Sequence, residues 1–216
     1  MIRNVIFDFD GTLADTTQGI IRCTQATLEE MDLPVASAER IQATIGLPLR
    51  ECFERGTDTP AERLDEAVAT YRRLFNGIAV PVTVLYDGVA PTLRLLQERG
   101  LRLSIATSRG HASLVMLLEK LGIREHFCEL AATDAVAHPT PAPDLALLLM
   151  ERTGARPGET LVVGDTVFDI RMGRSAGCRT CGVTFGNQTR AQLATAQPDW
   201  IIDRFPALTE VLDAAE

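Results

Sequence analysis

Two aspartates near the N-terminus are spaced for chemistry on phosphorus. Asp8 and Asp10 lie in DFDGTLAD, residues 8–15, where they flank one apolar residue and precede Gly11. Alternate residues of a strand point the same way, so the two carboxylates are expected side by side. One could attack a phosphorus atom while the other passes a proton to or from the leaving oxygen or the attacking water.

Further polar side chains follow three later apolar runs, namely Thr107 and Ser108, Thr133 and Asp134, and Asp165 and Thr166, with Asp169 one helical turn further on. Ligands of open parallel sheets bind beyond the carboxyl ends of the strands, so these side chains are expected around one crevice. Thr133 and Asp134 are read as turn and helix-cap residues. The other carboxylates would repel one another without a cation or a shared proton, and this set suits Mg²⁺.

The elements that must position these residues alternate along the chain. Apolar runs predict strands over residues 4–9, 101–106, 128–132, 160–164, 178–183 and, more weakly, 199–202. Helical patterns lie over 90–99, 110–121, 143–153, 167–176 and 206–215, and four of them end at Gly100, Gly122, Gly154 and Gly177. Strands joined by crossover helices predict an α/β fold with a doubly wound parallel sheet.

About ninety residues separate the first two predicted strands, more than one crossover helix requires. This segment shows a helical pattern over 17–31, a cap at Ser37 for a segment through Thr44, and a capping box at Thr59-Pro60-Ala61-Glu62 that opens a helix closed by Gly77. We therefore predict an all-helical cap domain over residues 16–82. Residues 1–15 and 83–216 would form the core domain.

Composition argues against several classes of protein. The formal net charge of −8 makes nucleic acid a poor partner, and no apolar run is long enough to span a membrane. The five scattered cysteines and the absence of a signal-peptide pattern favour a reducing cytoplasm. Cys178 and Cys181 match C-x-x-C but fall in a predicted strand, where they would face opposite ways, so a redox or zinc role is not expected.

With these residues in view, the chain resembles the haloacid dehalogenase superfamily, in its phosphoglycolate-phosphatase-like and β-phosphoglucomutase-like branch. The resemblance rests on DFDGTLAD at 8–15, IATS at 105–108 and VGDTVFDIRMGRSAG at 163–177, and it covers nearly the whole chain. It implies a Rossmann-like core with a helical cap and a magnesium-dependent phosphatase acting on a small phosphorylated metabolite. Dehalogenase members lack the second aspartate of the opening motif, so Asp10 points to phosphoryl transfer.

The resemblance also implies roles for single residues. Asp8 would form an aspartyl-phosphate and bind Mg²⁺, while Asp10 would act as general acid and base and offer its backbone carbonyl to the metal. Thr107 would hold a phosphoryl oxygen, and Asp165 would be the remaining metal carboxylate. Asp169 would orient these ligands or serve as a second acid of the same loop.

The chain departs from the family at one cationic position. The family usually shows Lys-Pro-x-Pro-Asp after the third strand, whereas this sequence has Thr140 in place of the lysine. A missing cation would remove charge stabilisation of the transition state. Arg109 or His138 could bring positive charge near the phosphate, whereas Lys120 is read as a solvated helix residue.

Further substrate contacts are expected from both domains. Ser108, next to Thr107, is a candidate phosphate-binding residue, and Arg50 could reach a substrate anion when the cap closes, helped by flexibility at Gly46. Closure would exclude water from the reaction. The sequence does not indicate an oligomeric state.

Three other functions share some of these features. A phosphosugar mutase of the same family would use the same motifs but return the phosphoryl group to a second hydroxyl. A weakly active or non-catalytic phospholigand-binding protein would be explained by Thr140. A receiver domain also gathers aspartates on a parallel sheet, but it would not need the helical insert and ranks last.

Overall fold

The core of the protein is one six-stranded parallel sheet. The structure, a computed structural model, describes residues 1–215. The strands are β1 (Asn4–Phe7), β4 (Arg102–Thr107), β5 (Glu129–Ala132), β6 (Thr160–Gly164), β7 (Arg179–Val183) and β8 (Trp200–Ile202). Their spatial order is β5-β4-β1-β6-β7-β8, and all pairs are parallel, which confirms the predicted doubly wound sheet. This order puts β1 next to β6 at the centre.

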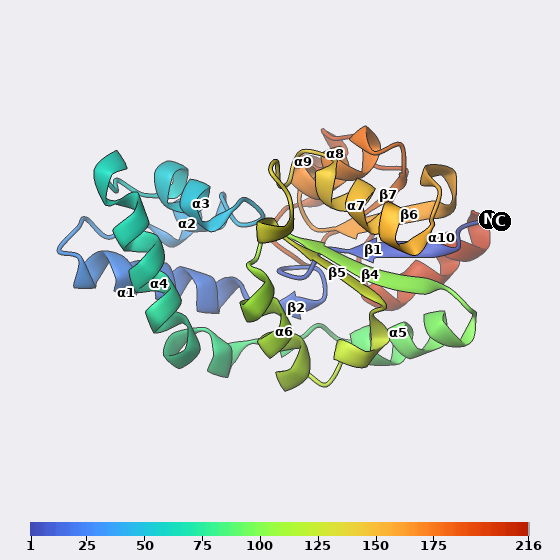
Figure 1. The fold of residues 1–216 in the computed structure, drawn as a ribbon, viewed down its shortest axis with the longest axis horizontal. Helices are drawn as coiled ribbons and strands as arrows, with labels where there is room; N and C mark the ends of the chain where they lie inside the picture. Colours follow the sequence, from blue (N-terminus) through green and yellow to red (C-terminus); the bar gives the residue numbers. More distant parts are fainter. Residues whose placement is uncertain (216) are drawn as a thin grey trace.

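Helices cover both faces of the sheet (Figure 1). The core helices are α5 (Val89–Glu98), α6 (His111–Lys120), α7 (Asp144–Thr153), α8 (Val167–Ser175), α9 (Arg190–Ala194) and α10 (Leu208–Ala214). Phe7 packs in the larger apolar cluster, with α5, α6 and α10, whereas its neighbour Ile6 packs in a second cluster with α7 and α8. Because both faces are buried, the central strands read as continuous apolar runs. The sequence did not predict α9.

Glycines end the core helices as predicted. Gly100, Gly122, Gly154 and Gly177 all have φ between 65° and 79°, a left-handed conformation that residues with a Cβ disfavour.

The helical insert consists of α1 (Thr17–Glu30), α2 (Ala38–Gln42), α3 (Leu49–Gly56) and α4 (Leu64–Ile78). We call residues 17–78 the cap. The Oγ of Ser37 accepts a hydrogen bond from the backbone N–H of Arg40, so the predicted helix cap is confirmed. The domain boundaries at 15/16 and 82/83 stay a prediction.

The predicted capping box at residues 59–62 is wrong. The hydroxyl of Thr59 bonds to the hydroxyl of Thr57 at 2.7 Å, and a short 3-10 turn over Ala61–Arg63 precedes α4. Gly77 does not close the helix either. Its φ is not positive, so the backbone continues in helical form to Ile78.

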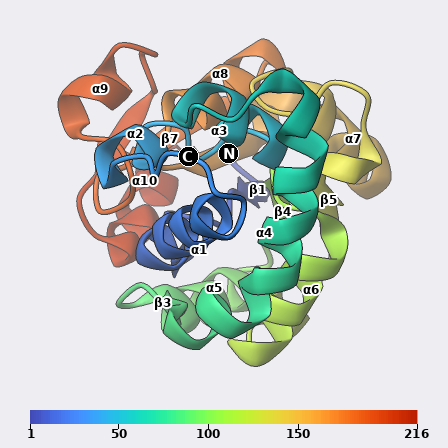
Figure 2. The ribbon, with the colours of Figure 1, turned by 90° about the vertical axis from the view of Figure 1, so that its left-hand side faces the viewer.

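Two short strands, which the sequence did not predict, join the cap to the core. β2 (Ala14–Asp15) and β3 (Val84–Leu85) pair antiparallel where the chain leaves and re-enters the core. The cap lies beyond the carboxyl ends of the sheet strands, and Figure 2 shows α1, α3 and α4 in front of the sheet when the molecule is viewed from that side. This is the edge where the predicted site residues follow the strands.

The cap is closed on the core. Ser108 Oγ donates a hydrogen bond to the Gly46 carbonyl oxygen at 2.7 Å. Gly46 has φ +103°, and a Cβ at this position would stand 3.2 Å from the Thr166 side chain. Gly46 therefore allows a close approach between a cap loop and the loop after β6, rather than serving simply as a flexible joint.

The C-x-x-C cysteines face opposite ways, as expected. Cys178 belongs to the smaller cluster, with its Sγ 3.7 Å from the sulfur of Met150, whereas Cys181 belongs to the larger cluster on the other face. Within residues 1–215 all five cysteines are free thiols. None of the helices in this part of the chain is long and apolar enough to cross a membrane.

Two glycines within helices are predicted to respond in opposite ways to alanine. Gly173 of α8 lies against the sheet, and a Cβ there would stand 2.7 Å from Thr180 Cγ2 and 2.8 Å from Val162 Cβ. Gly173→Ala should therefore lower the free energy of unfolding by about 1–3 kcal/mol through overpacking.

Gly77→Ala is the matched control, because a Cβ added to this helical residue would meet no atom within 4 Å. It should raise the free energy of unfolding by about 0.5–1 kcal/mol. Urea denaturation of both variants checks this pair. A Gly173→Ala protein as stable as the native one would contradict the close packing of α8 on β6 and β7.

Candidate active site

Three buried carboxylates meet at the ends of the two central strands. Asp8 follows β1, Asp165 follows the neighbouring β6, and Asp169 lies in the first turn of α8. One carboxylate oxygen from each lies within 4.8 Å of the others. The pairing of β1 with β6 brings Asp8 and Asp165 together, and the Asp8 N–H donates to the Val163 carbonyl at 2.9 Å.

The electrostatics of this cluster favour a cation. Burial and the neighbouring carboxylates, Asp169 first, raise the pKa of Asp8 well above its usual range. Burial and the Asp169 carboxylate raise the pKa of Asp165 to about 7, and burial raises the pKa of Asp169 to about 6. Oδ2 of Asp8 is buried and has no hydrogen-bond partner in the described chain. A group of hard oxygen donors with an unsatisfied atom fits Mg²⁺.

Surrounding donors fix two of the carboxylates. Asp165 Oδ2 accepts hydrogen bonds from the backbone N–H of Asn187 at 2.6 Å and from its Nδ2 at 2.8 Å, and Thr12 Oγ1 lies 3.4 Å from Oδ1. Asp169 Oδ2 accepts from the Thr166 N–H at 3.0 Å and from its hydroxyl at 2.7 Å, in a capping box of α8. These bonds hold the carboxylates in place despite their mutual repulsion.

Asn187 and Thr12 were not identified from the sequence. Asn187 lies in the loop after β7, four residues beyond the strand, so reading that loop as carefully as the loops after β1 and β6 could have found it. Thr12 belongs to the opening motif itself.

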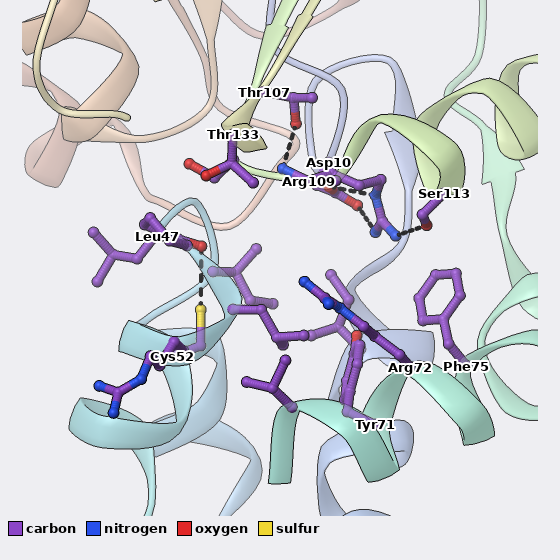
Figure 3. Close-up of a pocket in the computed structure, with 18 of the residues that line it drawn as sticks. Asp10, Leu47, Cys52, Tyr71, Arg72, Phe75, Thr107, Arg109, Ser113 and Thr133 are labelled. Carbon is purple, nitrogen blue, oxygen red and sulfur yellow. Dashed lines mark hydrogen bonds and ion pairs between the residues drawn. The ribbon is translucent and has the colours of Figure 1, made fainter. Parts of the chain in front are cut away.

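The second aspartate of the opening motif faces an arginine. Arg109 Nε lies 3.0 Å from Asp10 Oδ2, and Nη2 lies 2.5 Å from Oδ1 (Figure 3). The guanidinium also donates to Ser113 Oγ at 2.9 Å, and it lies over the ring of Phe75 from the cap at 4.7 Å. Burial alone would lower the pKa of Arg109, but the facing Asp10 carboxylate outweighs it and the pKa is raised.

The Arg109 contact fixes the orientation of the Asp10 side chain. Both carboxylate oxygens of Asp10 are engaged in a bidentate pair, the geometry in which arginine binds carboxylates most firmly. Asp10 does not contribute a carboxylate oxygen to the cluster of Asp8, Asp165 and Asp169. Any metal contact by Asp10 would therefore involve its backbone carbonyl, as the family resemblance implied.

The two hydroxyl residues after β4 lie beside these groups. Thr107 is buried, and its Oγ1 accepts a hydrogen bond from the Arg109 N–H at 3.2 Å. Ser108, as described above, is bonded to the cap. Asp134 accepts from the backbone N–H of His111, the first residue of α6, so its reading as a helix-cap residue agrees with the structure.

A cavity of about 810 Å³ lies between the cap and the core (Figure 3). Its lining includes six predicted site residues, namely Asp8, Asp10, Thr107, Ser108, Arg109 and Arg50. Asp165 and Asp169 each have a carboxylate oxygen within 4.8 Å of one of Asp8, but they do not line the cavity. Every predicted site residue thus lines this cavity or belongs to the acidic cluster that reaches it through Asp8.

Three other residues considered from the sequence do not line this cavity. Thr140 is buried, with its hydroxyl directed at the sulfur of Met172 at 3.5 Å. His138 is exposed and lies 3.2 Å from Asp144. Lys120 donates to the carbonyl oxygens of Val80 and Thr83. Arg109 is therefore better placed than His138 or Lys120 to bring positive charge to the site.

Comparison with known proteins is consistent with this geometry. The sequence profile of the haloacid dehalogenase-like hydrolases matches residues 5–183. The chain is 40% identical over 215 residues to a protein of Dickeya dadantii (strain 3937) named probable phosphatase IndB. The aligned region covers 98% of this chain and 92% of that protein. It is 34% identical over 236 residues to the phosphoglycolate phosphatase of Escherichia coli (strain K12), with 96% of this chain and 92% of that one covered.

A solved structure shows the same fold. A hydrolase of the haloacid dehalogenase-like family from Streptococcus pneumoniae superposes with a TM-score of 0.87 at 25% sequence identity, covering 100% of this chain and 99% of that one. The motifs, the sheet order and these similarities agree, and the chain belongs to the haloacid dehalogenase-like hydrolase family, as an enzyme similar to its phosphatases.

Proposed function

We propose that this enzyme is a magnesium-dependent phosphatase that hydrolyses a small phosphate monoester through an aspartyl-phosphate on Asp8. The observation that carries the proposal is the position of Asp8. Its carboxylate belongs to a buried acidic cluster, has an oxygen without a hydrogen-bond partner in the described residues, and lines the cavity together with Asp10. A nucleophile, a proton-transfer group and a cation site would thus lie next to one another at the cavity.

In the first step, an Asp8 carboxylate oxygen attacks phosphorus and the bond from phosphorus to the alcohol oxygen breaks. Asp10, which carries the proton taken from water in the preceding turnover, gives that proton to the departing alcohol. In the second step, Asp10 takes a proton from water as the water oxygen attacks the aspartyl-phosphate, which releases inorganic phosphate and restores the Asp8 carboxylate. Asp8, Asp165 and the Asp10 backbone carbonyl would hold Mg²⁺, with Asp169 beside them, and the ion would offset the charge of the phosphoryl oxygens.

The neighbouring side chains would orient and stabilise the reacting groups. Thr107 would donate its hydroxyl proton to a phosphoryl oxygen, and Arg109 would hold Asp10 in place and contribute positive charge that Thr140 does not supply. Ser108 would keep the cap closed through Gly46, and closure would exclude bulk water from the reaction. Arg50 remains a candidate contact for the substrate from the cap.

The relatives support this proposal. Several curated relatives are named phosphoglycolate phosphatases, and the relative in Dickeya dadantii is also named as a phosphatase. A cytoplasmic location is part of the proposal and is supported by the five free thiols of the described chain. The mutase alternative differs in the acceptor of the phosphoryl group, so it is separated by whether phosphate release matches substrate loss.

Asp8→Asn should reduce phosphate release to background, because the amide is a poor nucleophile and is uncharged. Asp10→Asn should lower kcat by about 10²–10⁴-fold through the loss of proton transfer. Phosphate release from a panel of phosphate monoesters with saturating Mg²⁺ measures both effects, with circular dichroism to confirm folding. Native-like release by Asp8→Asn would exclude the covalent mechanism, and substrate loss without matching phosphate would favour a mutase.

Arg109→Gln should lower kcat/KM by roughly a hundredfold, since it removes a preorganised cation and the two donors that hold Asp10. His138→Gln is the comparison, and because His138 is exposed and does not line the cavity it should leave kcat/KM unchanged. Both are measured as full pH profiles. Selective loss of activity on the acidic side of neutrality in His138→Gln would show that His138, and not Arg109, supplies the charge.

Mg²⁺ should raise Tm more at about pH 8 than at about pH 5, because ion binding requires carboxylates that the fold tends to keep protonated. The raised pKa values of Asp8, Asp165 and Asp169 mean that the metal-free native state binds more protons than the unfolded chain. These groups therefore contribute their full stabilisation of the metal-free protein at pH values below their ordinary pKa values. This stabilisation is lost as the pH rises through about 6 to 7.

Thermal unfolding at matched ionic strength, with and without MgCl₂, measures this effect. Asp165→Asn removes one like charge, so it should raise the Tm of the metal-free protein at about pH 8 and greatly reduce the shift produced by Mg²⁺. An equal Mg²⁺ shift in the native protein and in Asp165→Asn would show that the ion does not bind at this cluster.

A further inference from the structure

The cavity between cap and core is larger than a phosphoryl group and a two-carbon acid require. Its volume of about 810 Å³ falls in the range of roughly 300–1,000 Å³ that holds ligands of drug size. Asp8, Asp10 and Thr107 line it where the sheet strands end, so the phosphoryl group is assigned to that part of the cavity. The remaining space would be left to water if the alcohol part of the substrate were very small.

The walls of this remaining space are largely apolar. Aliphatic side chains line it from the cap and from α6, including Ile20, Ile45, Leu47, Leu49, Val68 and Met116. Water against such walls is unfavourable, and an apolar group that displaces it is favoured. The shape and lining therefore suit an ester whose alcohol part is bulky and largely apolar.

Three arginines line the cavity, and two of them already have acidic partners. Arg109 is engaged by Asp10 and packed on Phe75. Arg50 Nε lies 3.2 Å from an oxygen of Asp65. Arg72 of α4 has no hydrogen bond or ion pair from its side chain to any residue in 1–215, and Figure 3 shows it extending into the cavity. An unpaired guanidinium here is available to a ligand anion.

We propose that the substrate is a phosphate monoester of a bulky, largely apolar alcohol that carries a second anionic group, and that Arg72 binds this group. The inference rests on the proposed function, because it assumes that the phosphoryl end lies at Asp8. The phosphate then lies at Asp8, where the carboxylates would hold Mg²⁺, the apolar part packs against the aliphatic walls, and the far anion pairs with Arg72. Arg72 is thus a specificity-determining residue.

Three probe esters separate the parts of this proposal, namely phosphoglycolate, benzyl phosphate and 4-carboxybenzyl phosphate. The two benzyl esters differ by one carboxylate, and phosphoglycolate has a carboxylate but no bulky group. Calorimetric titration into Asp8→Asn with saturating Mg²⁺ gives a Kd for each probe without turnover. The carboxybenzyl ester should bind about tenfold tighter than either of the others, as expected for a charge-assisted contact added to a filled cavity.

Arg72→Gln in the same background should abolish the difference between the two benzyl esters and leave benzyl phosphate affinity unchanged. Arg73→Gln is the matched control, because Arg73 is the next residue of α4 but pairs with Glu30 and does not line the cavity. It should keep the difference. The inference is overturned if phosphoglycolate binds as tightly as the carboxybenzyl ester, or if Arg50→Gln rather than Arg72→Gln removes the difference.

Phosphate release by the native enzyme from the same three probes distinguishes a failure of this inference from a failure of the proposed function. If phosphoglycolate is hydrolysed and neither benzyl ester binds, the phosphatase proposal stands and the inference fails. If the carboxybenzyl ester binds tightly through Arg72 but none of the three probes is hydrolysed, the anion-binding role of Arg72 stands, whereas the phosphatase proposal and the assignment of this ester class as substrate both fail.

Discussion

The repulsion among Asp8, Asp165 and Asp169 is the constraint on which the rest of the site depends. Parallel pairing of β1 and β6 puts two of these carboxylates at adjacent strand ends, and the first turn of α8 adds the third. Their burial makes the like charges costly. The surrounding donors from Thr12, Thr166 and Asn187 offset part of this cost, and a hard cation would offset more.

The cap adds contacts to the site that the core lacks. Gly46 approaches the loop after β6 and accepts a hydrogen bond from Ser108, while Phe75 covers the guanidinium of Arg109. Arg109 in turn holds Asp10. Cap closure and the orientation of Asp10 are therefore linked through one buried side chain, which lies 99 residues from Asp10 in the sequence.

Local patterns explain which features could be predicted from the sequence. The strands of the sheet are apolar runs, and a glycine that follows a helical pattern, such as Gly154, is a common helix terminus, so both were predictable. The prediction that Gly77 closes a helix was wrong because glycine can also adopt the helical backbone conformation. The strands β2 and β3 have two residues each and carry no periodicity. The Arg109 contact with Asp10 and the exposure of Arg72 to the cavity are tertiary features that no local pattern reports.

The central claim is that Asp8 is the nucleophile, and trapping the acyl phosphate tests it most directly. Enzyme quenched during turnover of a hydrolysed phosphate monoester with Mg²⁺ would be treated with borohydride, which reduces an aspartyl-phosphate to homoserine, and mapped by mass spectrometry. The account predicts homoserine at position 8, dependent on both substrate and Mg²⁺. Turnover with Asp8 unmodified, or homoserine at position 10 instead, would contradict it.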